Sequence, residues 1–125
     1  MVLCDTNILI NAFNGRVDTI QELNNIGYEN IVLSAITVME LYQGMSNKTE
    51  LAQMKKKIKY FDVVHFDEQV SEKAIELMLL FNLSHGLLIP DAIIGAAAIL
   101  HQIPLYTYNL KDFRFMPDII FYTPK

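Results

Sequence analysis

The chain has 125 residues and a formal net charge of −4 at pH 7, and 52% of its residues are hydrophobic. This length fits one domain that closes a core without disulfides, and no apolar run reaches the ~20 residues that span a membrane. The acidic balance argues against binding nucleic acid through charge alone, but not against an enzyme whose carboxylates hold cations over a phosphate.

Short apolar runs, bounded by polar or turn residues, are typical of buried strands. We expect strands over residues 2–4, 30–34, 63–66, 104–107 and 119–122. Apolar residues at helical spacing predict helices over 6–13, 18–26, 37–45, 48–60 and 67–83, and Pro90 opens a last helix of small residues. This alternation predicts an α/β fold with a mainly parallel five-stranded sheet flanked by helices on both faces. Without a linker or a repeat, we expect one domain over residues 1–125.

The only cysteine, Cys4, lies in the first expected strand. It excludes an internal disulfide, and without a second cysteine a zinc site is disfavoured. The N-terminus also lacks the basic patch and cleavage site of a secretory signal. We therefore expect a cytoplasmic protein with no membrane segment.

Acidic residues follow strands or open helices at four places. They are Asp5, Glu40, Asp91 and Asp112. In a parallel sheet the carboxyl ends of the strands and the starts of the following helices share one edge, so Asp5, Glu40 and Asp112 should converge there. Topology alone does not place Asp91, which follows a helix and a short loop.

Each acid also has a structural explanation. Asp5 suits a helix N-cap, and Asp91 suits the positive end of its helix. Thr37-x-x-Glu40 matches a capping box, which would leave the Glu40 carboxylate less free to bind a metal. Asp112 could be a solvated loop residue.

If the acids converge, their like charges require a compensating cation. Oxygen ligands without histidine or cysteine favour Mg²⁺, or Mn²⁺, over zinc. The matching chemistry is hydrolysis of a phosphodiester, in which the metal lowers the pKa of a water and stabilises the leaving oxygen.

Four short motifs in this order resemble the PIN domain, and at this length most closely the VapC-type toxins of prokaryotic toxin–antitoxin pairs. The motifs are Asp5-Thr6-Asn7, Thr37-x-x-Glu40-Leu41, Pro90-Asp91-Ala92-x-Ile94 and Leu105-x-Thr107-x-Asn109-x-x-Asp112-Phe113. The resemblance covers essentially the whole chain. It implies a three-layer PIN-like fold, a metal-dependent endoribonuclease acting on RNA, a homodimer and a small antitoxin that occludes the cleft.

The resemblance also implies roles for individual residues. Asp5 and Asp91 become the main metal ligands, Glu40 completes the acidic triad directly or through a water, and Asp112 is the fourth acid. Two polar pairs support them. Thr107 and Asn109 would orient the acids and the attacking water, whereas Thr6 and Asn7 would hold the turn at Asp5.

Basic and aromatic residues give weaker signals. The Lys55–Lys59 cluster could contact RNA phosphates or form a solvated helix face, and Arg114 could contact a phosphate. Tyr106 and Tyr108 point the same way along a strand, into packing or toward a base. The three histidines share no motif, which favours structural or exposed roles.

Two other functions remain open from the sequence. A phosphatase could use Asp5 as a nucleophile, but the acid expected two residues later is absent, because position 7 is Asn. A catalytically silent module with the same fold could instead bind RNA or a protein.

Overall fold

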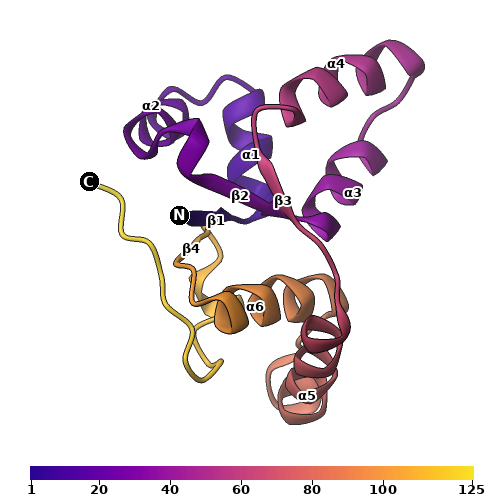
Figure 1. The fold of residues 1–125 in the computed structure, drawn as a ribbon, viewed down its shortest axis with the longest axis vertical. Coiled ribbons are helices and arrows are strands. Elements are labelled where there is room, and N and C mark those ends of the chain that lie inside the picture. The colour runs from indigo at the N-terminus through magenta and orange to yellow at the C-terminus, as the bar shows by residue number, and fades with distance from the viewer.

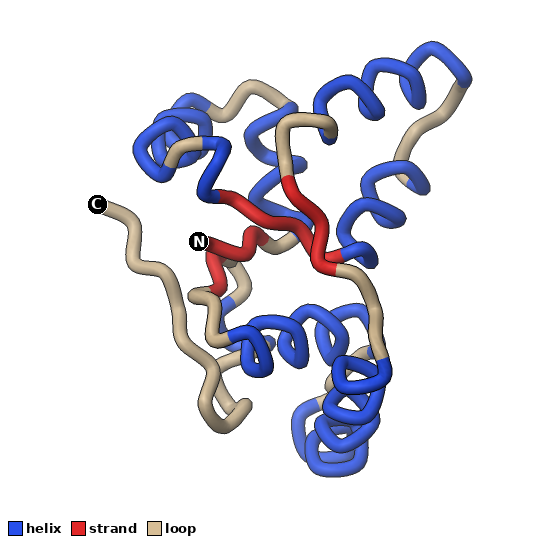
Figure 2. Tube along the Cα trace, in the orientation of Figure 1, coloured by secondary structure: helices blue, strands red, loops and turns tan.

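The computed structural model describes residues 1–125 and contains one parallel sheet of four strands in the order β3-β2-β1-β4 (Figure 2). The strands are β1 (Val2–Cys4), β2 (Ile31–Ser34), β3 (Asp62–Val64) and β4 (Leu105–Tyr106). β1 lies in the interior of the sheet, between β2 and β4. The parallel α/β arrangement predicted from the alternating pattern is confirmed.

Helices cover both faces of the sheet and give three layers (Figure 1). The α-helices are α1 (Thr6–Phe13), α2 (Val17–Ile26), α3 (Ala35–Gln43), α4 (Lys48–Ile58), α5 (Glu68–His85) and α6 (Ile89–His101). Short 3₁₀ turns form η1 (Tyr28–Asn30) and η2 (Leu110–Asp112). In Figure 1, α5 and α6 lie together on one side of the sheet, and α1 to α4 lie on the other. No helix is both long and apolar enough to cross a membrane.

Alternate residues of β1 belong to two separate hydrophobic cores. Leu3 packs into the core that α5 and α6 complete. Val2 and Cys4 pack into the core that α1 to α4 complete. Successive side chains of a strand point to opposite faces, so this one buried strand serves both layers.

The fifth expected strand, over residues 119–122, is present only as an isolated bridge between Phe121 and Leu105. The Leu105 N–H donates to the Ile120 carbonyl over 2.8 Å, and the Tyr122 N–H donates to the Leu105 carbonyl over 2.9 Å. The C-terminal segment therefore lies parallel beside β4 without a continuous ladder. β4 is itself only two residues long, which leaves little length to pair with.

Other differences are shifts of element ends. α3 begins at Ala35 and not at Thr37, because the Ser34 side chain caps it by accepting from the Ile36 N–H. β3 is Asp62–Val64 where residues 63–66 were expected. α5 extends to His85 and stops at Gly86, whose φ of +66° is the left-handed conformation that glycine adopts readily.

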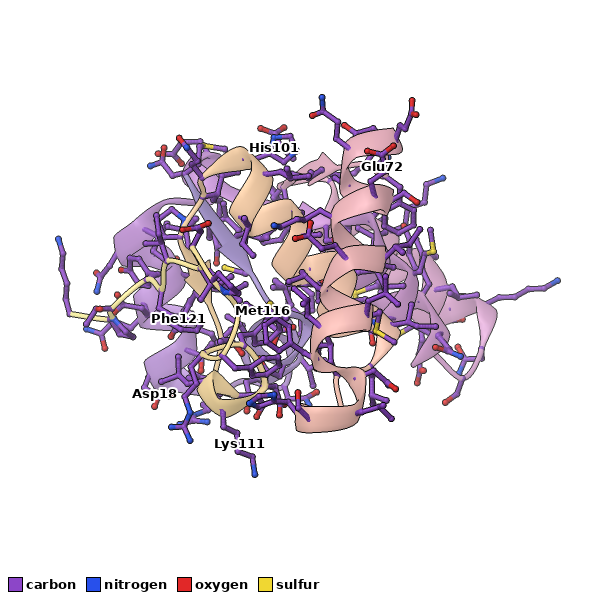
Figure 3. All side chains as sticks on the ribbon, turned by 90° about the horizontal axis from the view of Figure 1, so that it is seen from below. Asp18, Glu72, His101, Lys111, Met116 and Phe121 are labelled. Carbon is purple, nitrogen blue, oxygen red and sulfur yellow. The ribbon has the colours of Figure 1, made fainter.

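α6 approaches the C-terminal loop closely at Gly95. A Cβ built on Gly95 would overlap the thioether of Met116, which is itself buried. Figure 3 shows Met116 beside α6, on the segment that leads from η2 toward the C-terminus. The small residue thus lets this segment pack directly on α6, the helix whose first turn carries Asp91.

Candidate active site

Asp5 directly follows β1 and is buried, with 5% of its surface exposed. Its backbone N–H donates to the Tyr106 carbonyl at the end of β4, which fixes the residue at the carboxyl edge of the sheet. Both carboxylate oxygens are held: Oδ1 accepts from the Thr6 N–H and Oδ2 accepts from the Thr107 hydroxyl, each over 2.8 Å. Asp5 is therefore the N-cap of α1, as one alternative held, and also lies at the predicted edge.

Glu40 comes to the same edge from the middle of α3. The Thr6 hydroxyl lies 2.8 Å from Glu40 Oε1 and 3.0 Å from the Thr37 hydroxyl, so α1 and α3 are joined here. The capping box expected for Thr37 and Glu40 is wrong, because Ser34 caps the helix and Thr37 lies inside it. The Glu40 carboxylate is thus not folded back onto the start of α3.

Asp91 lies in the first turn of α6, and Asp112 ends η2. Figure 3 places His101, the last residue of α6, at the opposite end of the molecule from Lys111, so the first turn of α6 faces the η2 side. Asp91 thereby joins the other acids, although topology alone had not placed it there.

The charges of the four carboxylates act on one another. Partial burial, and then the charges of Asp5, Asp112 and Glu40, raise the pKa of Asp91 from 3.8 to about 6. Burial also raises the pKa of Asp5; the hydrogen bonds from Thr107 and Thr6 lower it, and the charges of Glu40 and Asp112 raise it again. The site therefore holds more negative charge than its surroundings stabilise.

No lysine or arginine forms an ion pair with any of these four acids. No three Asp, Glu, His or Cys side chains form a group that could hold a metal ion by themselves. The donor set still fits Mg²⁺ or Mn²⁺, because such ions are usually held by one or two carboxylates together with waters. Uncompensated, mutually repelling carboxylates are what a hydrated divalent cation would neutralise.

The polar residues beside the acids differ in their roles. Thr107 joins Asp5 to the loop that follows, because its hydroxyl oxygen also accepts from the Asn109 N–H over 3.0 Å. Asn7 contributes a carbonyl, which accepts from the Asn11 side chain over 2.7 Å. The Asn7 Oδ1 atom is buried and has no hydrogen-bond partner, which is unusual for a buried acceptor.

Sequence reasoning missed the support behind Thr107. The next residue, Tyr108, forms a hydrogen bond through its hydroxyl to that of Thr19 in α2. The guanidinium of Arg16 stacks over the Tyr108 ring at 4.8 Å and is paired with Asp18. Tyr106 and Tyr108 do lie together, with ring centroids 5.8 Å apart. No local pattern could identify Thr19 as the partner, since it lies 89 residues away.

The basic residues and histidines singled out earlier lie outside the carboxylate cluster. Arg114 is exposed just after η2, and Lys55–Lys59 end α4 with all four lysines exposed. His85 stacks on Phe115 at 4.2 Å, and His65 and His101 are exposed. None of the histidines takes part in the acidic site.

The fold is thus an α/β domain in which four carboxylates gather at the carboxyl ends of the strands of a parallel sheet. Residues 2–116 match the PIN domain family. The chain belongs to the PIN-domain family.

Known relatives agree with this assignment. The chain is 31% identical over 115 residues to Ribonuclease VapC1 of Methanocaldococcus jannaschii, covering 90% of this chain and 79% of that protein. A toxin–antitoxin complex from Klebsiella pneumoniae has a chain of 32% identity and TM-score 0.81, with 100% and 98% of the two chains covered. VapBC2 from Rickettsia felis, bound to a DNA fragment from its promoter, gives 25% identity, TM-score 0.81 and 98% coverage of both chains.

Proposed function

We propose that this protein is a VapC-type endoribonuclease that hydrolyses RNA phosphodiester bonds with Mg²⁺ or Mn²⁺ and forms the toxin half of a type II toxin–antitoxin pair. The observation that carries the proposal is the convergence of Asp5, Glu40, Asp91 and Asp112, where burial and then the charges of the other three acids raise the pKa of Asp91 to about 6. The relatedness to a protein named as a ribonuclease and to toxin–antitoxin complexes supports the same conclusion. We assign the activity to a single domain over residues 1–125.

Asp5 and Asp91 would hold the cation, with Glu40 and Asp112 reaching it directly or through waters. Bound there, the cation would supply a water of lowered pKa and positive charge against the phosphate. The protein itself orients the carboxylates. Thr107 and Thr6 fix both oxygens of Asp5, and Thr6 also fixes Glu40 Oε1, so these acids need not reorganise when the substrate binds.

The Asp91 carboxylate, unlike those of Asp5 and Glu40, is not held by a hydrogen bond. Only burial and neighbouring charges act on its carboxyl group, and no hydrogen bond from the protein restrains it. We infer that it takes up the proton or the cation as the site fills. Asn109 and Arg114, which follow on the same loop, are the groups we propose for positioning the attacking water and a substrate phosphate.

We also propose that the protein forms a homodimer and binds a small antitoxin. We place it in the cytoplasm, together with its RNA substrate. α5 exposes apolar side chains, with Leu79 82% and Leu83 98% exposed. An apolar face of this kind suits a protein partner. Copurification of a small protein encoded beside this chain, together with the mass of the purified chain in solution, would test both.

Cleavage of total RNA by the purified, partner-free chain is the decisive test. Discrete fragments should form with Mg²⁺ or Mn²⁺, vanish with chelator, and vanish in Asp5→Asn and in Asp91→Asn. Metal-dependent cleavage that persists in both folded variants would contradict the proposal. Binding of RNA without turnover under any metal would instead favour a silent module.

A further inference from the structure

A cluster of basic and aromatic side chains lies away from the acids, where α4 ends. We name it the lysine–tyrosine patch; its exposed members are Tyr28, Lys55, Lys56, Lys57, Lys59 and Tyr60. It holds four of the ten Lys and Arg residues of a chain whose net charge is −4. None of these lysines is ion-paired, so the charge is directed to solvent.

The patch surrounds a hollow of about 320 Å³. Its lining combines aromatic rings with one ammonium group: Ala12, Phe13, Tyr28, Lys57 and Tyr60. Tyr60 is 73% exposed, and its ring centroid lies 6.4 Å from that of Tyr28. Tyr28 packs edge-on against buried Phe61, and the Lys57 ammonium lies 5.1 Å from the centre of the Phe13 ring. The aromatic faces are therefore held in place and partly open.

Exposed aromatic rings beside unpaired lysines are the features with which proteins hold single-stranded nucleic acid. Bases stack on the rings, and ammonium groups contact the phosphates. Tyr28 and Tyr60 precede β2 and β3, so the patch lies at the amino end of the strands, opposite the acids.

Phe13 connects this patch with the acidic edge. It lines the patch hollow and also a second hollow of about 230 Å³, which Glu40 lines as well. Phe13 is the last residue of α1, about 12 Å along the helix axis from the N-cap Asp5. A strand of RNA with its reacting phosphate at the acids could continue over this helix for a few nucleotides and reach Tyr60.

We propose that the lysine–tyrosine patch is a second contact for single-stranded RNA, in which a base stacks on Tyr60 and flanking phosphates lie against Lys56 and Lys57. This inference rests on the proposed function for its substrate class. It adds a contact that would hold the RNA without taking part in the chemistry.

The test measures binding of a labelled single-stranded RNA of mixed sequence by fluorescence anisotropy. Chelator is present so that no cleavage occurs. Tyr60→Ala should weaken binding about tenfold, and Tyr60→Phe should restore it. The double variant Lys56→Gln/Lys57→Gln should make the negative slope of log affinity against log salt shallower by about 1.4, because two phosphate contacts are lost. Lys48→Gln is the matched control, because Lys48 is exposed on the same helix but at its other end.

Cleavage is measured separately, in Mg²⁺, on the same RNA. Asp5→Asn should lose cleavage while keeping the Tyr60-dependent binding. If the wild type cleaves but Tyr60→Ala and the lysine variant bind RNA as tightly as Lys48→Gln, the patch proposal is overturned and the proposed nuclease stands. If RNA binding depends on Tyr60 but the wild type cleaves no RNA, the patch proposal stands and the proposed nuclease is overturned. Unchanged RNA affinity together with lost binding of a protein partner would reassign the patch to that partner.

Discussion

The Thr107 hydroxyl donates to Asp5 Oδ2 over 2.8 Å, joining residues 102 positions apart. This bond unites the end of β4 with the end of β1 and lowers the pKa of a carboxyl group that burial raises. Thr107→Val, which keeps the side-chain shape, should raise the pKa of Asp5 and destabilise the protein by about 2 kcal/mol.

Cleavage by Thr107→Val near neutral pH should fall at least about tenfold, since Asp5 loses the group that orients it. The measurement is the initial cleavage rate beside urea unfolding of the same samples. Thr107→Ser is the control and should stay near wild type. A valine variant with an unchanged rate would show that this bond serves only folding.

The raised pKa of Asp91 predicts that the stability of the metal-free protein falls as the pH rises from about 4 to about 6. Its pKa is about 6 in the folded chain against 3.8 ordinarily, so between these values the folded state binds the extra proton. The free energy of unfolding contributed by this group therefore falls as the pH rises through that window. Asp91→Asn removes the penalty and should stabilise the metal-free protein at about pH 7.5 by roughly 1 kcal/mol, a value reduced because Asp91 is partly exposed.

The Asp91 effect is measured by urea unfolding of wild type and variant in chelator, near pH 4 and near pH 7.5. The advantage of Asp91→Asn should be present at the higher pH and absent at the lower. An equal difference in stability at both pH values would mean that folding does not raise the pKa of Asp91. The same variant should be inactive, so that stability and activity change in opposite directions.

Added Mg²⁺ should raise the melting temperature of the wild type by several degrees near neutral pH, because the ion binds the folded acids and not the unfolded chain. Asp5→Asn and Asp91→Asn should lose most of this increase. Asp118→Asn is the control: Asp118 is exposed, lies outside the cluster and has a φ of +67° that asparagine also tolerates. A similar increase in all three variants would place the ion elsewhere.

The contact of Gly95 with Met116 predicts a coupled pair. Gly95→Ala adds a methyl group that overlaps the buried thioether, so it should destabilise by about 2 kcal/mol in spite of the better helix propensity of alanine. Met116→Ala alone leaves a cavity. The double variant should be more stable than the sum of the two single changes by at least about 0.5 kcal/mol, measured by urea unfolding. Strict additivity would mean that the two residues do not touch.

The layers of the fold and the edge at which the acids gather could be predicted from the sequence, because both depend on local patterns. Runs such as Val2–Cys4 and the helical spacing in α5 specify element type, and parallel topology then brings Asp5, Glu40 and Asp112 to one edge. Element ends were less predictable. Ser34 and Thr37 both suit a helix start, and only the folded chain shows that Ser34 caps α3.

Pairings between distant residues could not be predicted. The C-terminal segment is fixed by Tyr122, whose hydroxyl donates to the buried Glu22 carboxylate over 2.5 Å, and by the Lys125 N–H, which donates to the same oxygen over 3.2 Å. Neither Tyr122 nor Glu22 belongs to a motif. Such bonds depend on how the layers pack, and that information is spread over the whole chain.

The interior place of β1 has a consequence for synthesis of the protein. Of the four strands, β1 is synthesised first, yet its neighbour on one side, β4, is about a hundred residues away in the sequence. Thr107 and Asp112 follow β4. A nascent chain can pair β1 with β2, but it cannot orient Asp5 or assemble the four acids until β4 and η2 have also left the ribosome. Under the proposed function, a nascent molecule therefore stays harmless to RNA until these residues have been synthesised.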